Sequence, residues 1–107
     1  MGIPNIDERI QTGKGDIISI KVWEVAKSEQ AKSEHYPQGK KFSFVFIHQN
    51  IRYLGYDNAE QKGIHKHSID LETGIKQETT INETSIIKIL RIFKKEVGQL
   101  TNQLYKE

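Results

Sequence analysis

Residues 41–48 read Lys-Phe-Ser-Phe-Val-Phe-Ile-His and form the clearest β-strand pattern in the chain. Phe42, Phe44 and Phe46 alternate with other residues, so they share one face of the strand, while Val45 lies on the other. Three aromatic side chains on one face make a large apolar surface. We expect a helix to pack against this surface.

A helix that fits this role follows at residues 84–105. Its apolar residues recur at intervals of four and three, which places them on one face: Ile86, Leu90, Phe93, Val97, Leu100 and Leu104. We expect Thr84 to be the N-cap and Gly98 to mark a bend or a frayed last turn. If the end of the apolar stripe extends past the sheet, it would form a subunit contact, which makes a homodimer through this helix a candidate assembly.

Four further stretches have strand-like composition and lie between turn residues: 16–26, 51–56, 65–71 and 75–81. His48-Gln49-Asn50 is expected to form a tight turn, with His48 as a turn residue. Residues 27–41 are polar and contain Pro37 and Gly39, so we expect a long, mobile hairpin loop. Residues 59–63 are expected to form a polar loop.

The order of these elements predicts a two-layer α+β domain over residues 1–107. Residues 1–15 would form an N-terminal arm or a short helix, the helical turn falling near residues 6–11. Residues 16–81 would form an antiparallel sheet of four to five strands, and the helix at 84–105 would cover one face.

Composition limits the classes of function. The chain has 107 residues, 36% hydrophobic and 28% charged, which suits one folded domain. Sixteen basic and 14 acidic side chains give a net charge of +2, which neither requires nor opposes nucleic-acid binding. There is no cysteine, and no apolar run is long enough for a signal peptide or a membrane span. We therefore expect a cytoplasmic protein without membrane contact.

The segment from Tyr53 to His67 concentrates the reactive side chains. His65 and His67 are two residues apart on an expected strand, so their rings should point the same way. Two imidazoles could take a proton from a ribose hydroxyl and return one to the leaving oxygen. RNA cleavage without a metal also needs a cation against the phosphate, a role open to nearby basic residues: Lys62, Lys66 and Arg52.

Two other interpretations of the histidines stay open. A metal ion could use both rings with Asp57 as a third ligand. A His-x-His pair alone is a weak metal signal, however, so we predict neither a metal site nor a cofactor. Alternatively, both rings are structural, at the edge of a core with Ile69 and Leu71. Asp57 and Asn58 are first of all turn formers.

The motif order carries a family resemblance. The motifs are Tyr56-Asp57-Asn58-Ala59, a short loop with glycine, His65-Lys66-His67, a polar strand, and an amphipathic helix that begins with Thr-Ser. This order of motifs resembles the small bacterial and archaeal TumE-type toxin family. Members carry an aromatic-Asp-Asn-Ala run followed by a histidine-rich phrase, often His-His-Lys-His. The resemblance covers roughly residues 42–97. Ile64 stands where the fuller phrase has its first histidine, so a mechanism that needs three histidines does not carry over directly.

The resemblance implies the toxin of a two-gene toxin–antitoxin pair, held inactive by a neighbouring antitoxin, a DNA-binding protein of the helix-turn-helix type. Toxins of this size typically arrest growth by attacking RNA or translation. The residues that we expect at the site are His65, His67, Asp57 and Asn58 for catalysis, and Lys66, Arg52, Tyr56 and Lys62 for substrate binding.

Two hypotheses follow. In the first, the protein is a metal-independent endoribonuclease in which His65 and His67 are acid and base, Asp57 orients one ring, and Lys66 or Arg52 contacts the phosphate. In the second, it is a non-catalytic protein-interaction or regulatory module that binds a helix-turn-helix partner through its edge strand and C-terminal helix.

Overall fold

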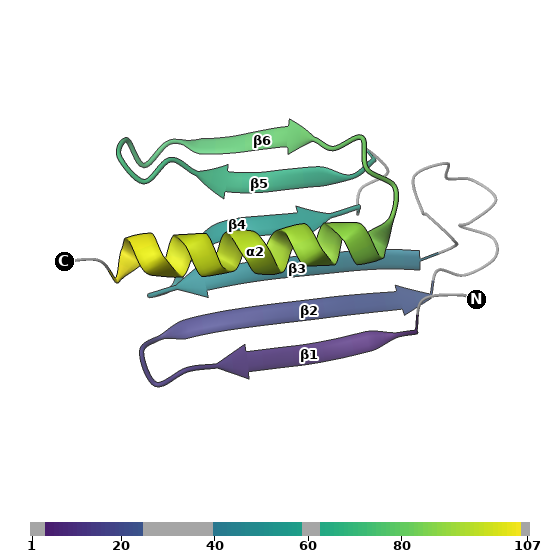
Figure 1. The fold of residues 1–107 in the computed structure, drawn as a ribbon, viewed down its shortest axis with the longest axis horizontal. Helices are drawn as coiled ribbons and strands as arrows, with labels where there is room; N and C mark the ends of the chain where they lie inside the picture. The colour runs from purple at the N-terminus through teal and green to yellow at the C-terminus, as the bar shows by residue number, and fades with distance from the viewer. Residues whose placement is uncertain (1–3, 25–39, 59–62, 106–107) are drawn as a thin grey trace.

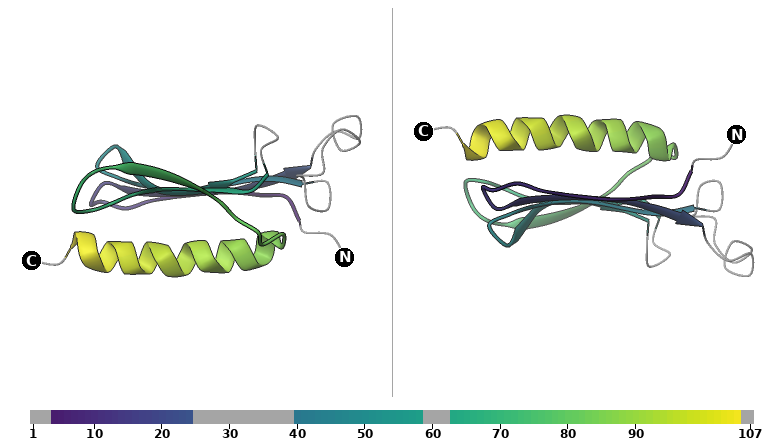
Figure 2. Two further views of the ribbon diagram at one scale, coloured as in Figure 1. Left: turned by 90° about the horizontal axis from the view of Figure 1, so that it is seen from above. Right: turned by 90° about the horizontal axis from the view of Figure 1, so that it is seen from below.

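The computed structural model describes residues 4–24, 40–58 and 63–105. They form a two-layer α+β structure, with an antiparallel sheet of six strands and a helix against one face (Figure 1, Figure 2). The elements are β1 (Ile6–Gln11), β2 (Asp16–Glu24), β3 (Lys40–His48), β4 (Ile51–Asp57), β5 (His65–Ile69), β6 (Lys76–Thr80) and α2 (Ile86–Leu104). The strands lie in the sheet in the order in which they occur in the chain.

Residues 6–11 form strand β1, so the short helix predicted for this N-terminal arm is wrong. A single helical turn forms few hydrogen bonds for the backbone that it orders, whereas β1 pairs with β2 along its whole length. The turn between them supports this pairing, because the hydroxyl of Thr12 accepts hydrogen bonds from the amides of Lys14 and Asp16, both at 3.3 Å. Gly15 follows with a φ of 87°, which favours glycine. The sheet therefore has six strands and not four to five.

The turn between β3 and β4 is the tight turn expected from the sequence. Gln49 and Asn50 have φ values of 49° and 67°, as two-residue hairpin turns of the primed type require. The loop expected at 27–41 falls mainly on residues 25–39, and the polar loop at 59–63 mainly on residues 59–62. Both stretches lie outside the described residues.

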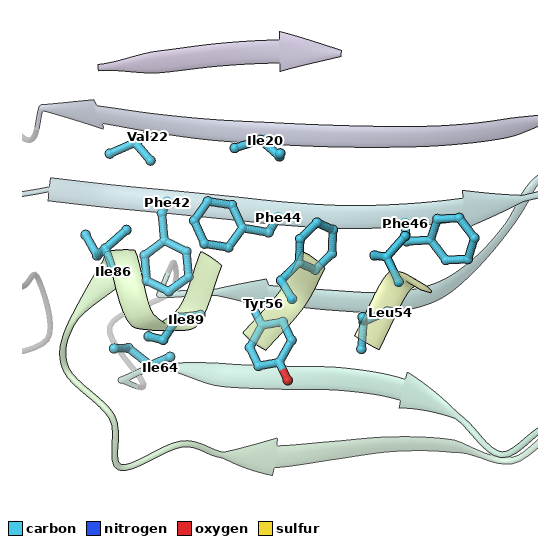
Figure 3. Packing of buried hydrophobic residues seen from close by; sticks show 12 residues of the cluster. Ile20, Val22, Phe42, Phe44, Phe46, Leu54, Tyr56, Ile64, Ile86 and Ile89 are labelled. Atoms are coloured by element: carbon cyan, nitrogen blue, oxygen red, sulfur yellow. The ribbon is translucent and has the colours of Figure 1, made fainter. Parts of the chain in front are cut away.

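The phenylalanine strand forms the centre of the core, as predicted. Phe42, Phe44 and Phe46 of β3 are 0% exposed and face α2 (Figure 3). The ring centroids of Phe44 and Phe93 are 5.7 Å apart. The buried residues of the helix are Ile86, Ile89, Phe93 and Val97. This packing fixes the helix over β3 and β4, so the helix covers one face of the sheet and not the other.

The N-cap of α2 is Ser85 and not Thr84. The Ser85 side chain accepts a hydrogen bond from the amide of Lys88 at 3.3 Å, which satisfies a donor that the first helical turn leaves unpaired. Gly98 lies within the helix, which continues to Leu104. The turns that follow the glycine are therefore helical, and the frayed last turn expected at Gly98 does not occur.

The C-terminal end of α2 packs against the sheet. Leu100 and Leu104 are partly buried against the core, and the hydroxyl of Tyr105 donates a hydrogen bond to Asp16 at 2.7 Å. The end of the apolar stripe, on which the homodimer prediction was based, thus packs largely against the core of the same molecule. The homodimer itself stays a prediction.

Candidate functional site

The two faces of the β4–β5 hairpin carry different residues. Tyr56 of β4 is 2% exposed beneath α2. In the register of the hairpin, Asp57 lies opposite His65 and Gly55 lies opposite His67. Because side chains alternate along a strand, His65 and His67 point to the face of the sheet away from α2. Figure 2 shows that the coloured elements leave this face uncovered.

The two histidine rings are aligned with each other. Their planes differ by 16° and their centroids are 6.4 Å apart. This separation follows from the strand itself, since two residues along a strand span about 6.6 Å. The sequence prediction that both rings point the same way is therefore confirmed by the geometry.

The two rings have acceptors on different nitrogens. Nδ1 of His65 is hydrogen-bonded to the carbonyl oxygen of Gly63 at 2.7 Å, and Nε2 of His67 lies 3.2 Å from Oδ2 of Asp57, within ion-pair distance. A carbonyl can only accept, so Nδ1 of His65 carries hydrogen, and in the neutral ring the free lone pair is on Nε2. A defined tautomer of this kind suits acid–base chemistry.

His65 is deeply placed. The residue is 7% exposed, and Nε2 lies 3.9 Å from Oε1 of Glu78, within ion-pair distance if the ring is protonated. The purely structural interpretation fits the Nδ1 side of His65, which binds the backbone of Gly63. The Nε2 side faces Glu78, whose side chain is 51% exposed.

Arg52 lies beside His67 because the intervening residue has no side chain. A Cβ atom placed on Gly55 would lie 3.7 Å from Cδ of Arg52 and 3.8 Å from Cβ of His67. The arginine stem and Cβ of His67 thus both lie next to the position that a Gly55 side chain would occupy. Arg52, His67 and Glu78 also line a groove of about 910 Å³ that continues between the β3–β4 and β5–β6 turns. Lys76 lines the same groove, so Arg52 and Lys76 are basic groups that the structure brings near His67.

Lys66 and Tyr56 are not with the histidines. Both lie on the side of the sheet that α2 covers, where they donate hydrogen bonds to the two carboxylate oxygens of Glu96. Burial, together with the Glu96 carboxylate, raises the pKa of Tyr56 well above its usual value. This trio ties α2 to β4 and β5 and is separated from His65 by the sheet.

Asn58 has a role in the sheet. It is 0% exposed, its Oδ1 accepts from the amide of Phe42, and its Nδ2 donates to the carbonyl of Lys40, both at 3.0 Å. The side chain thus pairs with the start of β3 beyond the last residue of β4. Lys62, the remaining predicted contact, lies outside the described residues.

A second polar cluster was not predicted as a site. Nδ1 of His48 lies 2.5 Å from Oδ1 of Asp16, and both residues are 7% exposed. Tyr105 binds the other oxygen of the same carboxylate, and its ring centroid is 5.4 Å from that of His48. The prediction that His48 is a turn residue is therefore wrong. The residue is buried in the helix-facing layer. Its alternation with Phe42, Phe44 and Phe46 was the signal for this.

Among residues 4–24, 40–58 and 63–105, no group of three His, Asp or Glu side chains is placed to hold a metal ion. The donors nearest the histidines are Asp57, which binds His67, and Glu78, which faces His65. Each carboxylate thus serves a different ring in this arrangement.

Comparisons with protein-family models, with curated proteins and with solved structures gave no match to this chain. In the part of the chain that the structure describes, no helix has the length and apolar character needed to cross a membrane.

Proposed function

We propose that this protein is the toxin of a toxin–antitoxin pair and that it acts as a metal-independent endoribonuclease. The observation that carries the proposal is the pair of aligned rings of His65 and His67, 6.4 Å apart on one strand. The Gly63 carbonyl fixes the tautomer of His65, and Asp57 lies within ion-pair distance of His67. The toxin assignment itself rests on the motif resemblance to the TumE-type family.

The proposed reaction is transfer of the phosphodiester to the neighbouring ribose hydroxyl. One imidazole removes the proton of the 2′-hydroxyl, whose oxygen attacks the adjacent phosphorus. The other imidazole gives a proton to the 5′-oxygen as its bond to phosphorus breaks. The products are a 2′,3′-cyclic phosphate and a 5′-hydroxyl, and solvent then restores both rings. Positioned acid–base groups typically contribute about 10²–10⁴-fold each.

The spacing of the rings suits this chemistry. An acid and a base must each come within about 3 Å of the oxygen that they serve, and the two oxygens lie on opposite sides of one phosphorus. We place the phosphate across the outer edges of the two rings, whose centroids are 6.4 Å apart. Arg52, which runs beside His67, is the group that we assign to the charge developing on the phosphate oxygens.

Cleavage of RNA by the purified protein tests the enzymatic part. We expect His65→Ala and His67→Ala each to lower the cleavage rate by about 10²–10⁴-fold while circular dichroism shows that both variants stay folded. Lys66→Gln is the matched control, because it changes the residue between the two histidines but acts on the other face. We expect it to keep cleavage within a few-fold of wild type. Full cleavage by both histidine variants would show the mechanism to be wrong.

Induction in cells tests the toxin part. Wild type should arrest growth and leave cleaved total RNA, whereas the double variant His65→Ala/His67→Ala should do neither. Co-expression of a helix-turn-helix protein encoded next to this gene should restore growth. Arrest that persists in the double variant would contradict RNA cleavage as the cause, and absence of arrest by wild type would contradict the toxin assignment.

A further inference from the structure

The face of the sheet that carries the histidines extends across all six strands. Alternation and register place two rows of residues on this face, each running perpendicular to the strands. One row is Arg9, Ser19, Val45, Gly55, His67 and Glu78. The other is Asp7, Lys21, Ser43, Asp57, His65 and Thr80. The histidine pair is therefore in line with residues of β1 and β2 at the other edge of the sheet.

We propose that single-stranded RNA crosses this face along the two rows, from the histidine pair on β5 to Arg9 on β1 and Lys21 on β2. The proposal rests on the proposed function, because it places the phosphate to be cleaved at His65 and His67. It adds a binding surface that extends beyond the reacting phosphate. We name this surface, made of Arg9, Lys21 and Arg52, the basic track.

The charges and their positions support RNA as the occupant. Arg9, Lys21 and Arg52 are exposed, and Lys21 is three strands from His65 in the same row, which corresponds to about 14 Å. A single strand of RNA that passes over the site carries further phosphates in that direction. Positively charged grooves that follow the backbone are the usual means by which proteins bind single strands.

The acidic residues of the two rows do not block this path. Asp57 lies against His67, and Glu78 faces His65, so both carboxylates act at the histidine end. Asp7 lies opposite Lys21 and reduces its net attraction, which leaves Arg9 as the stronger contact at the far end. Between the two ends the rows carry Ser19, Ser43, Val45 and Gly55. These short residues leave room for a strand to approach the sheet.

Charge reversal at two places with equal net charge tests the track. The test variant is Arg9→Glu/Lys21→Glu, and the matched control is Lys94→Glu/Lys95→Glu on the exposed side of α2. Binding is measured by fluorescence anisotropy with a labelled 2′-O-methyl oligouridine, which lacks the attacking hydroxyl and so cannot be cleaved. Unmodified RNA of the same sequence is used separately to measure cleavage.

We expect the test variant to bind at least about tenfold more weakly than wild type, and its affinity to depend less steeply on salt. The slope of log K against log salt should fall in magnitude by about 1.4, since each lost phosphate contact on a single strand removes about 0.7. The control should bind like wild type. Equal losses in the two variants would mean a nonspecific effect of net charge, and no loss in the test variant would exclude the track.

The two probes separate this proposal from the proposed function. Track-dependent binding of the 2′-O-methyl strand without cleavage of the unmodified strand would support the track and contradict the nuclease. Cleavage with no effect of the Arg9→Glu/Lys21→Glu change would support the nuclease and contradict the track. Sedimentation velocity tests whether a second copy of the chain occupies this face instead. If the protein is a dimer, and the test variant dissociates it without changing RNA binding, this face is a subunit interface and the proposal is overturned.

Discussion

Asp16 links three elements through one carboxylate. Its oxygens bind His48 at the end of β3 and Tyr105 just after α2, and the ammonium group of Lys14 lies 5.0 Å from the Tyr105 ring centroid. Burial alone would raise the pKa of Asp16, but the hydrogen bonds from His48 and Tyr105 outweigh this effect and lower the pKa below its usual value. The ionised form is therefore the one that the fold stabilises.

The lowered pKa predicts how stability changes with pH. A carboxylate with a lower pKa in the folded than in the unfolded state contributes stability above the unfolded pKa, and this contribution is lost as the pH falls through the folded pKa. We expect Asp16→Asn to lower the free energy of unfolding by about 1–3 kcal/mol at neutral pH, with the difference from wild type shrinking in acid. Urea unfolding of both proteins from neutral to acidic pH measures this difference in the free energy of unfolding. Glu24→Gln, whose side chain is 73% exposed, should change stability by less than about 0.5 kcal/mol. A pH-independent effect of Asp16→Asn would contradict the assigned role.

Residue-scale prediction succeeded where local periodicity decides the outcome. The common direction of His65 and His67 follows from a period of two and was confirmed. The same period places Lys66 on the opposite face, although closeness in the sequence had made it a candidate contact. Asp16 could not be found in this way, because its partner His48 is 32 residues away and no local signal indicates which residues will be paired.

At the scale of elements, α2 was the most predictable part and β1 the least. The helix has a sustained apolar period, and its length leaves little room for another structure. The sequence of β1 (Ile6–Gln11) has only one apolar residue at each end of a charged stretch, which fits a short helix as well as an edge strand. Pairing with β2 decided between them, and such pairing is a tertiary effect that local propensity does not contain.

Alanine substitutions at Gly98 and at Ser85 should change the stability of the protein in opposite directions. A Cβ atom added at Gly98 would meet no atom within 4 Å, and alanine is favoured over glycine within a helix by about 1 kcal/mol. We therefore expect Gly98→Ala to raise the free energy of unfolding by up to about 1 kcal/mol. Ser85→Ala should lower it by about 1 kcal/mol through loss of the N-cap.

Denaturant unfolding of the two variants and of their double mutant measures both effects. The sites are thirteen residues apart on one helix, so the two changes should add. Destabilisation by Gly98→Ala would mean that the last turns of α2 depend on the flexibility of glycine, which the structure gives no reason to expect.

At the scale of the whole molecule, the sheet ends in two polar edges. All five residues of β6 (Lys76–Thr80) are exposed, and none is apolar. In β1 the residues Asp7, Glu8 and Arg9 are exposed and charged. Charged and polar edge strands are a common means of preventing pairing between sheets of different molecules. The edges are therefore unsuited to self-association, whereas the face that bears the histidines stays accessible.

Replacing polar residues on one edge strand should allow the sheets of two molecules to pair. We expect Lys76→Val/Gln77→Val to promote self-association, because β6 would keep its unpaired backbone groups and gain apolar side chains of high strand propensity. Sedimentation velocity over a range of protein concentrations measures the effect. The matched control is Lys94→Val/Lys95→Val on α2, which adds the same kind of apolar side chains where the backbone groups are already paired within the helix. Association of the β6 variant alone would support protection of the edge by its polar residues. Equal association of both variants would show that added surface hydrophobicity, and not the open strand, is the cause.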